Sequence, residues 1–175
     1  MNTGMDSEQQ LAKLYEQYFP KLMIFCRNMT GCNTDDAEDL SQDILIQAYE
    51  KQGRFNPKYA FSTWLYRIAR NRCIDWLRKN SRLRQFASAD FQLERLADTY
   101  SDPAGELERN QLQKRITTCL NTLAPDDRAI AFLFFYRDEK LREIARVIDK
   151  PLGTVKYRIH AIKKKMQAAL EDRHD

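Results

Sequence analysis

The sequence predicts an all-α protein made of two small helical domains joined by a flexible acidic linker. Only five of its 175 residues are glycine and five are proline, which disfavours β-sandwiches, propellers and Gly-rich nucleotide-binding sheets. Apolar residues make up 43% of the chain, so a packed core is possible, and they recur at helical spacing in two blocks. Between the blocks this periodicity fades. We therefore divide the chain into domains at 1–81 and 109–175, with a linker over 82–108.

The first predicted helix occupies residues 7–31. Its apolar residues follow one another at steps of three and four, which forms a single apolar face. Pro20 lies inside this pattern, and we expect it to break or kink the helix near Phe19 because proline lacks an N–H donor and clashes with the preceding turn.

Two further helices complete the first block. Thr34, followed by two acids, opens the second helix, whose inward stripe has the four-residue spacing of a helix face. Residues 53–59 (GRFNPKY) have the composition of a turn. A third helix is expected to start near Ser62 and to direct its arginines away from the core. Three helices with short connections are enough to enclose one common core.

The segment 82–108 is predicted to be an acidic tether. It carries three bases and six acids, and its only helical pattern is a short one over 91–97.

The second block begins near Leu107 and ends in a short helix, a tight turn and a longer basic helix. Pro125 and the two acids after it indicate a helix start. Residues 141–148 form the short helix, 149–153 form the turn, and Thr154 is the expected cap of the last helix.

The distribution of charge indicates separate binding surfaces, and the composition argues against a membrane-spanning or secreted protein. Residues 51–81 carry eight bases and one acid, whereas residues 1–50 carry three bases and nine acids, so separate surfaces for separate partners are indicated. The longest apolar run, 129–136, is far shorter than the roughly 20 residues that a membrane helix needs. Residues 1–10 have no signal-peptide pattern, and the four scattered cysteines favour a reducing compartment, so we expect a cytoplasmic protein.

The layout of residues 141–165 is typical of a helix-turn-helix, whose second helix enters the DNA major groove. The polar side chains of its last helix lie off the apolar stripe and offer groups for base edges and phosphates. They are Thr154, Lys156, Tyr157, Arg158, His160, Lys163 and Lys164. A solvated amphipathic helix that ends a bundle is the alternative interpretation.

A second constellation interleaves aromatic and basic residues over 54–72, as in surfaces that bind single-stranded nucleic acid by stacking and phosphate attraction. Phe61 and Trp76 are better interpreted as core. Phe55, Tyr59 and Trp64 lie in or beside the loop and are the candidates for exposed rings.

Catalytic and metal sites have little support. The sequence has no Gly-rich phosphate loop and no clustered His, Cys and Asp set, so we predict no catalytic residues, no metal and no cofactor. The acids at residues 35–43 are explained more simply by the helix dipole than by metal binding. Cys26 and Cys32 are interpreted as buried or idle thiols, with a metal or redox role as the alternative.

Two motifs resemble a known family. Residues 36–43 (DAEDLSQD), 61–71 (FSTWLYRIARN) and 74–78 (IDWLR) resemble region 2 of the extracytoplasmic-function (ECF) sigma factors. Residues 141–148 with 151–160 (PLGTVKYRIH) resemble their region 4. The order, the spacing and the chain length agree, and the resemblance spans about 10–81 and 107–170.

The sequence departs from the family pattern at three places in region 4. Phe134 stands where an arginine is common, and Asp138-Glu139 replaces a usual Gly-Leu or Gly-Met. Asp149 replaces a frequent glycine, which the left-handed turn conformation accessible to aspartate tolerates.

The resemblance implies a dissociable subunit of bacterial RNA polymerase that selects and helps to melt promoters. The second helix would dock on the β′ clamp through Asp39, Gln42, Asp43 and Ile46. The loop and third helix would hold the non-template strand of the −10 element through Asn56, Lys58, Tyr59, Trp64, Arg67, Arg70 and Asn71. Region 4 would read the −35 duplex with the last-helix residues given above and contact the β flap.

The implied partners are core RNA polymerase, promoter DNA and an anti-sigma factor that is membrane-bound in some members of the family, with no small-molecule substrate. A stand-alone helix-turn-helix repressor or activator is the alternative from another class, and a helical enzyme or adaptor has no support from individual residues. A repressor would need a ligand pocket or dimer face in the first block, where this sequence has an acidic helix and an aromatic-basic loop.

Overall fold

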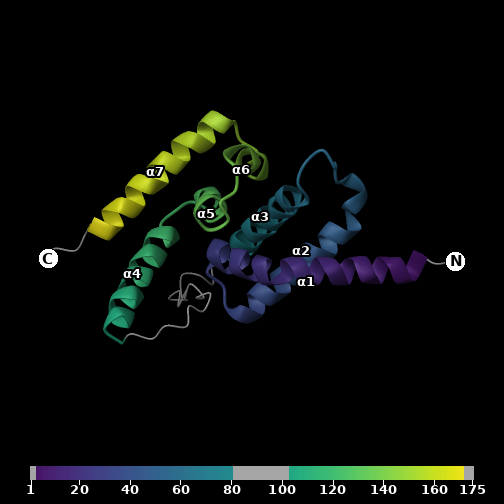
Figure 1. The fold of residues 1–175 in the computed structure, drawn as a ribbon, viewed down its shortest axis with the longest axis horizontal. Coiled ribbons are helices and arrows are strands. Elements are labelled where there is room, and N and C mark those ends of the chain that lie inside the picture. The colour runs from purple at the N-terminus through teal and green to yellow at the C-terminus, as the bar shows by residue number, and fades with distance from the viewer. Residues whose placement is uncertain (1–2, 81–102, 172–175) are drawn as a thin grey trace.

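The computed structural model describes residues 3–80 and 103–171, and every regular element within these residues is a helix (Figure 1). The predicted all-α fold is confirmed. The first unit contains α1 (Thr3–Thr30), α2 (Thr34–Glu50), the short 3₁₀ turn η1 (Gln52–Arg54) and α3 (Phe61–Lys79). The second contains α4 (Pro103–Asn121), α5 (Pro125–Ala131), the π-helical turn η3 (Phe132–Tyr136), α6 (Leu141–Ile148) and α7 (Leu152–Glu171). Most of the predicted linker, and the short helix expected over 91–97, lie outside the described residues.

Helix α1 is longer than predicted and runs through Pro20 without a break. The expected break is therefore wrong. Pro20 and Glu16 both lie on the exposed side of the helix, so water can bind the Glu16 carbonyl that loses its N–H partner. The opposite face of α1 is buried and packs on α2 and α3.

Helix α2 begins at the predicted Thr34. Asn33 caps it, because its side-chain Oδ1 accepts a hydrogen bond of 2.8 Å from the backbone N–H of Asp36. Asp35 and Asp36 in the first turn add a favourable interaction with the helix dipole.

The second unit differs from the predicted boundaries at two helix starts. Helix α4 starts at Pro103, so its first turns lie within the segment 82–108. Helix α7 starts at Leu152, and Thr154 therefore lies within its first turn and is not its cap. The turn between α6 and α7 is as expected, since Asp149 ends α6 in the left-handed conformation at φ 58°.

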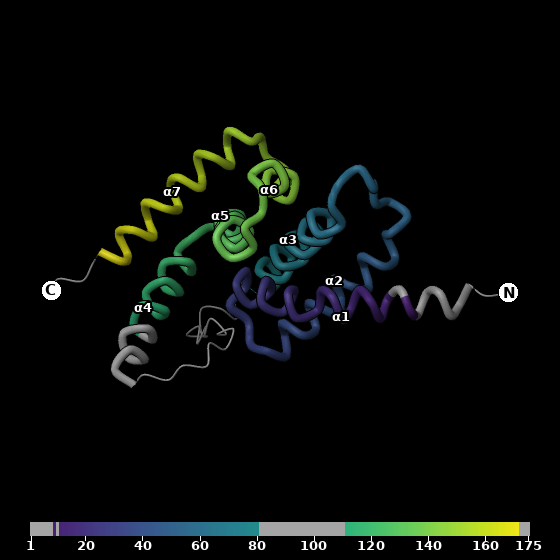
Figure 2. The backbone as a smooth tube through the Cα atoms, viewed as in Figure 1, coloured from purple at the N-terminus to yellow at the C-terminus, as the bar shows by residue number. Residues whose placement is uncertain are grey.

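The two units pack on one another through one continuous apolar core. Helices α5 and α6 contact α3, and α5 also contacts α1. Figure 2 shows α5 and α6 beside α3 in the middle of the molecule. The Phe132 ring lies 5.2 Å from the Phe25 ring and 6.3 Å from the Tyr66 ring, measured between centroids. Region boundaries in the sequence therefore do not separate two independent cores in this structure.

Candidate nucleic-acid interface

The loop before α3 presents one exposed aromatic ring. Tyr59 is 44% exposed, whereas Trp64 is half-buried and packs against Phe55 and Phe61 at 5.6 and 5.4 Å between ring centroids. Phe61 is itself half-buried against the core, as predicted. Of the three rings proposed for base stacking, only Tyr59 is free of an aromatic cluster in the described chain.

Asn56 shapes this loop. Its Oδ1 accepts a 3.0 Å hydrogen bond from the Lys58 backbone N–H, and its carbonyl accepts another of 3.1 Å from the Tyr59 N–H. Such Asx turns fix the backbone of short loops. Lys58 is exposed beside Tyr59.

Two of the cationic residues of α3, Arg67 and Arg70, contact acids of the second unit. The Arg70 guanidinium donates to the Asp126 carboxylate, with a 2.8 Å bond from Nε, and to Asn71 Oδ1 at 2.9 Å. Arg67 forms an ion pair with Asp149 at 3.3 Å. The two arginines predicted to hold the −10 strand are therefore paired with acids of α5 and of the α6–α7 turn.

The recognition-helix side chains of α7 are mostly open to solvent. Tyr157 is 74% exposed, and Lys156, His160, Lys163 and Lys164 are exposed, while Val155, Ile159 and Ile162 are buried. The Lys163 ammonium lies 5.1 Å from the Phe134 ring centroid, so Phe134 offers it a cation–π contact in place of the usual arginine.

Arg158 is the exception on α7. Its guanidinium lies 3.3 Å from Asp127 Oδ1 and 3.7 Å from Asp126 Oδ2. Asp126 thus pairs with one arginine from each predicted DNA-contacting set.

Helix α2 carries a separate surface that is open to solvent. Ile46 is 50% exposed on the same helix face as three polar residues. Asp43 pairs with Arg72 at 2.6 Å, and the Gln42 amide donates to Glu38 at 3.3 Å. Asp39 is exposed, so the four residues predicted to bind polymerase do share one solvent-facing stripe.

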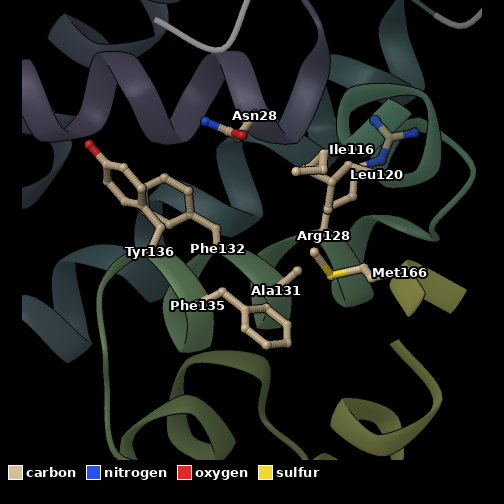
Figure 3. A pocket seen from close by; sticks show the side chains of 9 residues that line it. All are labelled: Asn28, Ile116, Leu120, Arg128, Ala131, Phe132, Phe135, Tyr136 and Met166. Carbon is tan, nitrogen blue, oxygen red and sulfur yellow. The ribbon is translucent and has the colours of Figure 1, made fainter. Parts of the chain in front are cut away.

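An apolar pocket of about 180 Å³ opens where α4, α5, η3 and α7 meet the end of α1 (Figure 3). Its walls include Ile116 and Leu120 of α4, Phe132 and Phe135 of the α5–η3 segment, and Met166 of α7. Phe135 is 44% exposed at its edge. The pocket has the size and the apolar lining to accept a side chain or two of a partner helix.

The cysteines are buried free thiols. Cys73 and Cys26 lie 3.8 Å apart, Sγ to Sγ, in the core between α1 and α3. Burial raises the pKa of the Cys32 thiol to about 11. At neutral pH the Cys32 thiol is therefore protonated, which disfavours metal ligation and rapid oxidation at this residue. Within residues 3–80 and 103–171, no helix is both long and apolar enough to span a bilayer.

Sequence reasoning did not assign Arg128, which is buried. Its guanidinium donates to three backbone carbonyls: those of Met29 at the end of α1 (3.1 Å), Asn121 (2.7 Å) and Leu123 (3.1 Å). The available signal was the position of Arg128 directly before the apolar run 129–136, because a guanidinium buried there needs such partners. Sequence reasoning also missed three acids that contact α3, namely Asp126, Glu143 and Asp149. The residues around each of these acids in the sequence do not indicate a contact with α3.

Comparison with known proteins decides the family. The family model described as Sigma-70 region 2 matches residues 14–83 of the chain. The family model described as Sigma-70, region 4 matches residues 113–166. The chain is 34% identical over 153 residues to the ECF RNA polymerase sigma factor RpoE of Cereibacter sphaeroides, covering 87% of this chain and 81% of that protein. It is 30% identical to SigW of Bacillus subtilis over 94% of this chain and 91% of the relative. The chain belongs to the ECF sigma factor family.

The fold is similar to that of two solved structures. The sigma factor RpoE of Bartonella quintana, determined with the anti-sigma factor NepR, matches with a TM-score of 0.70 at 25% identity over 95% of this chain and 99% of the other. CnrH, determined with the cytosolic domain of CnrY, has the same fold at a TM-score of 0.68. This ECF sigma factor is therefore an alternative sigma factor that directs transcription initiation, and sigma factors in general regulate transcription and are not enzymes.

Proposed function

We propose that this sigma factor divides promoter recognition between its two units. Region 2, taken as residues 1–81, binds core polymerase and melts the −10 element, and region 4, residues 109–175, reads the −35 element. The segment 82–108 connects them and, being acidic, threads toward the nucleic-acid channels of the polymerase. The protein acts in the cytoplasm, has no enzymatic activity and needs no cofactor or small-molecule substrate.

One observation carries the proposal: the described chain presents an acidic-apolar stripe on α2 and a basic surface on α7, in different units. A half-exposed isoleucine on a helix face that it shares with acids can serve as the apolar anchor of a protein interface. We assign Asp39, Gln42, Asp43 and Ile46 to the β′ clamp coiled coil.

The α3 loop supplies the melting surface. Tyr59 is exposed enough to stack on an unpaired base, and Lys58 beside it can hold a phosphate. Asn56 holds the loop in shape, and Trp64 supports it from the aromatic cluster. Arg67, Arg70 and Asn71 extend the surface along α3 toward the strand backbone.

The α7 surface supplies duplex recognition. The N-terminal half of α7 carries Lys156, Tyr157 and His160 on the side away from the buried stripe, as required of a helix that enters the major groove, and Arg158 lies at the edge of that stripe. Thr154 lies in the first turn, beside backbone N–H groups that favour phosphate. Lys163 and Lys164 follow one to two turns later and are assigned to phosphates.

Two further partners are proposed. The apolar pocket at the α4–α7 junction suits a helix from the β flap of the polymerase. Because the sigma factor RpoE of Bartonella quintana was determined in complex with the anti-sigma factor NepR, we also propose an anti-sigma partner for this chain.

Multi-round transcription with purified core polymerase and a pool of genomic fragments tests the function. With the sigma factor present, RNA 5′ ends should collect at a few positions that share −10 and −35 sequences, and without it they should not. A stand-alone repressor would give no such dependence, and transcription from core polymerase alone would be unchanged or reduced.

A further inference from the structure

We propose that the packing of region 4 on region 2 is an autoinhibitory latch, in which acids of region 4 occupy the promoter-binding residues of α3. This inference rests on the proposed function, since it concerns the same α3 residues. Beyond the proposed function, the latch gives the free protein a closed resting state, in which the Asp126 carboxylate is the central group.

Three of the seven residues assigned to the −10 strand are engaged by region 4. Arg70 is paired with Asp126, and Arg67 with Asp149. The Arg146 guanidinium covers the Tyr59 ring at 4.5 Å from its centroid. A base cannot stack on that face of Tyr59 while Arg146 lies there.

The carboxylates act as substitutes for phosphate. Asp126 accepts from the Nε edge of the Arg70 guanidinium and Asn71 accepts from Nη1, so a phosphate must displace Asp126 to bind that edge as a fork. The Thr63 hydroxyl, about two turns before Arg70 on α3, donates to Glu143 of α6 at 2.7 Å and extends the covered strip. Region 4 therefore competes directly with DNA for α3.

Asp126 links the two DNA surfaces. One of its oxygens accepts from Arg70 of α3, while the other lies 3.7 Å from Arg158 of α7. Its side chain is 20% exposed and that of Arg70 is 16% exposed, whereas the Arg67–Asp149 pair is 50% and 74% exposed. Exposed pairs contribute little and are screened by salt, so the Arg70–Asp126 pair carries most of the electrostatic part of the latch.

An apolar layer lies beneath these pairs. The Phe132 ring packs against both Phe25 and Tyr66, whose own rings lie 5.2 Å apart, and Arg128 reaches the Met29 carbonyl across the same junction. Opening the latch exposes Phe132, so the closed state is favoured until a partner covers that surface. Loss of the Asp126 pairs should therefore shift the equilibrium without removing the closed state altogether.

The test measures the distance between the two units in the full-length protein alone. Spin labels at Lys13→Cys on α1 and Lys165→Cys on α7 report it by pulsed electron paramagnetic resonance; the unmodified protein, whose native thiols are buried, controls for background labelling. Asp126→Asn removes the charge, and Asp126→Arg places a third cation beside Arg70 and Arg158. Asp75→Asn is the matched control, because Asp75 pairs with Arg78 within α3 itself.

We expect one short-distance population in the parent protein and in Asp75→Asn, and about tenfold more of a longer-distance population in the Asp126 variants. A fluorescent single-stranded DNA oligonucleotide should bind the Asp126 variants several-fold more tightly than the parent. Circular dichroism checks that the variants are folded.

Identical distance distributions in the parent and in both folded Asp126 variants would overturn the latch. A parent protein that is already open would overturn it as well. Failure of the proposed function is a separate result, since it shows as an absence of promoter-specific transcription by the parent with core polymerase, whatever the distances are.

Discussion

The two candidate DNA surfaces of this sigma factor differ in how they are presented. On α7 the lysines, Tyr157 and His160 face solvent, and only Arg158 is paired with acids. On α3 both arginines are paired and Tyr59 is covered on one face by Arg146. The candidate duplex-reading surface is thus open, while much of the candidate strand-melting surface is occupied by the protein itself.

The chemistry of the two surfaces explains the difference. A surface for an unpaired strand combines aromatic faces with cations. The aromatic faces attract the cationic side chains of a neighbouring helix, and the cations attract its acidic side chains. A recognition helix buries its apolar stripe in its own unit and leaves hydrated lysines outside, which offer little to pack against. Surfaces built for single strands are therefore easier for a protein to cover with its own residues.

The largest loss of function is expected from changes on α2, which belongs to neither of the two candidate DNA surfaces. Ile46→Asp combined with Asp43→Arg should weaken binding to core polymerase about 100-fold or more, since interface anchors contribute about 2 kcal/mol or more each. The fold should survive because Ile46 is half exposed and the Asp43–Arg72 pair is a surface pair. A pull-down with circular dichroism measures both; undiminished binding by a folded variant would remove α2 as the docking face.

The second effect separates the two rings of the melting surface. Tyr59→Ala should weaken open-complex formation by about 1–3 kcal/mol, the value of one stacked base, and a pre-melted promoter bubble should partly rescue it. Trp64→Ala should instead lower the thermal stability, because Trp64 belongs to the cluster with Phe55 and Phe61. Potassium permanganate footprinting and thermal melts distinguish them. If Tyr59→Ala unfolds the protein, its ring was structural.

The third effect tests the open surface. Arg158→Ala should relax preference at one or two −35 positions, each by about 1–2 kcal/mol, if its fork reads a guanine when released from Asp126 and Asp127. Lys164→Ala should weaken binding evenly and flatten the salt dependence. Selection of −35 variants with both proteins separates these outcomes. An unchanged preference for Arg158→Ala would assign the reading to Lys156 or Tyr157 and leave Arg158 to its ion pairs.

The smallest effect concerns stability at alkaline pH. The Cys32 thiol has a pKa of 9.0 when solvated, and burial raises it to about 11, so the unfolded chain loses this proton first as the pH rises. The free energy of unfolding should therefore fall between pH 9 and 11, by about 1 kcal/mol at pH 10 from this group. Denaturant titrations of the parent and of Cys32→Ala measure it. An equal loss in both proteins would show that Cys32 does not contribute.

The helices and their faces were predictable because they depend on local spacing. The bounds of α6, the start of α2 at Thr34 and the left-handed Asp149 follow from patterns within a few residues. The stripe of Asp39, Gln42, Asp43 and Ile46 was equally visible, since positions three and four apart share a face on any helix. Pro20 was misjudged, because the sequence does not say which carbonyls of a helix can reach water.

By itself, the sequence determined an all-α chain with a helix-turn-helix, an acidic docking helix and an aromatic-basic loop. Only the tertiary structure decided which of those cations remain available. Arg70 and Asp126 are 56 residues apart, Thr63 and Glu143 are 80 apart, and Arg128 and Met29 are 99 apart. Such pairs depend on how two packed units are oriented, and periodicity within one helix carries no information about the orientation of another.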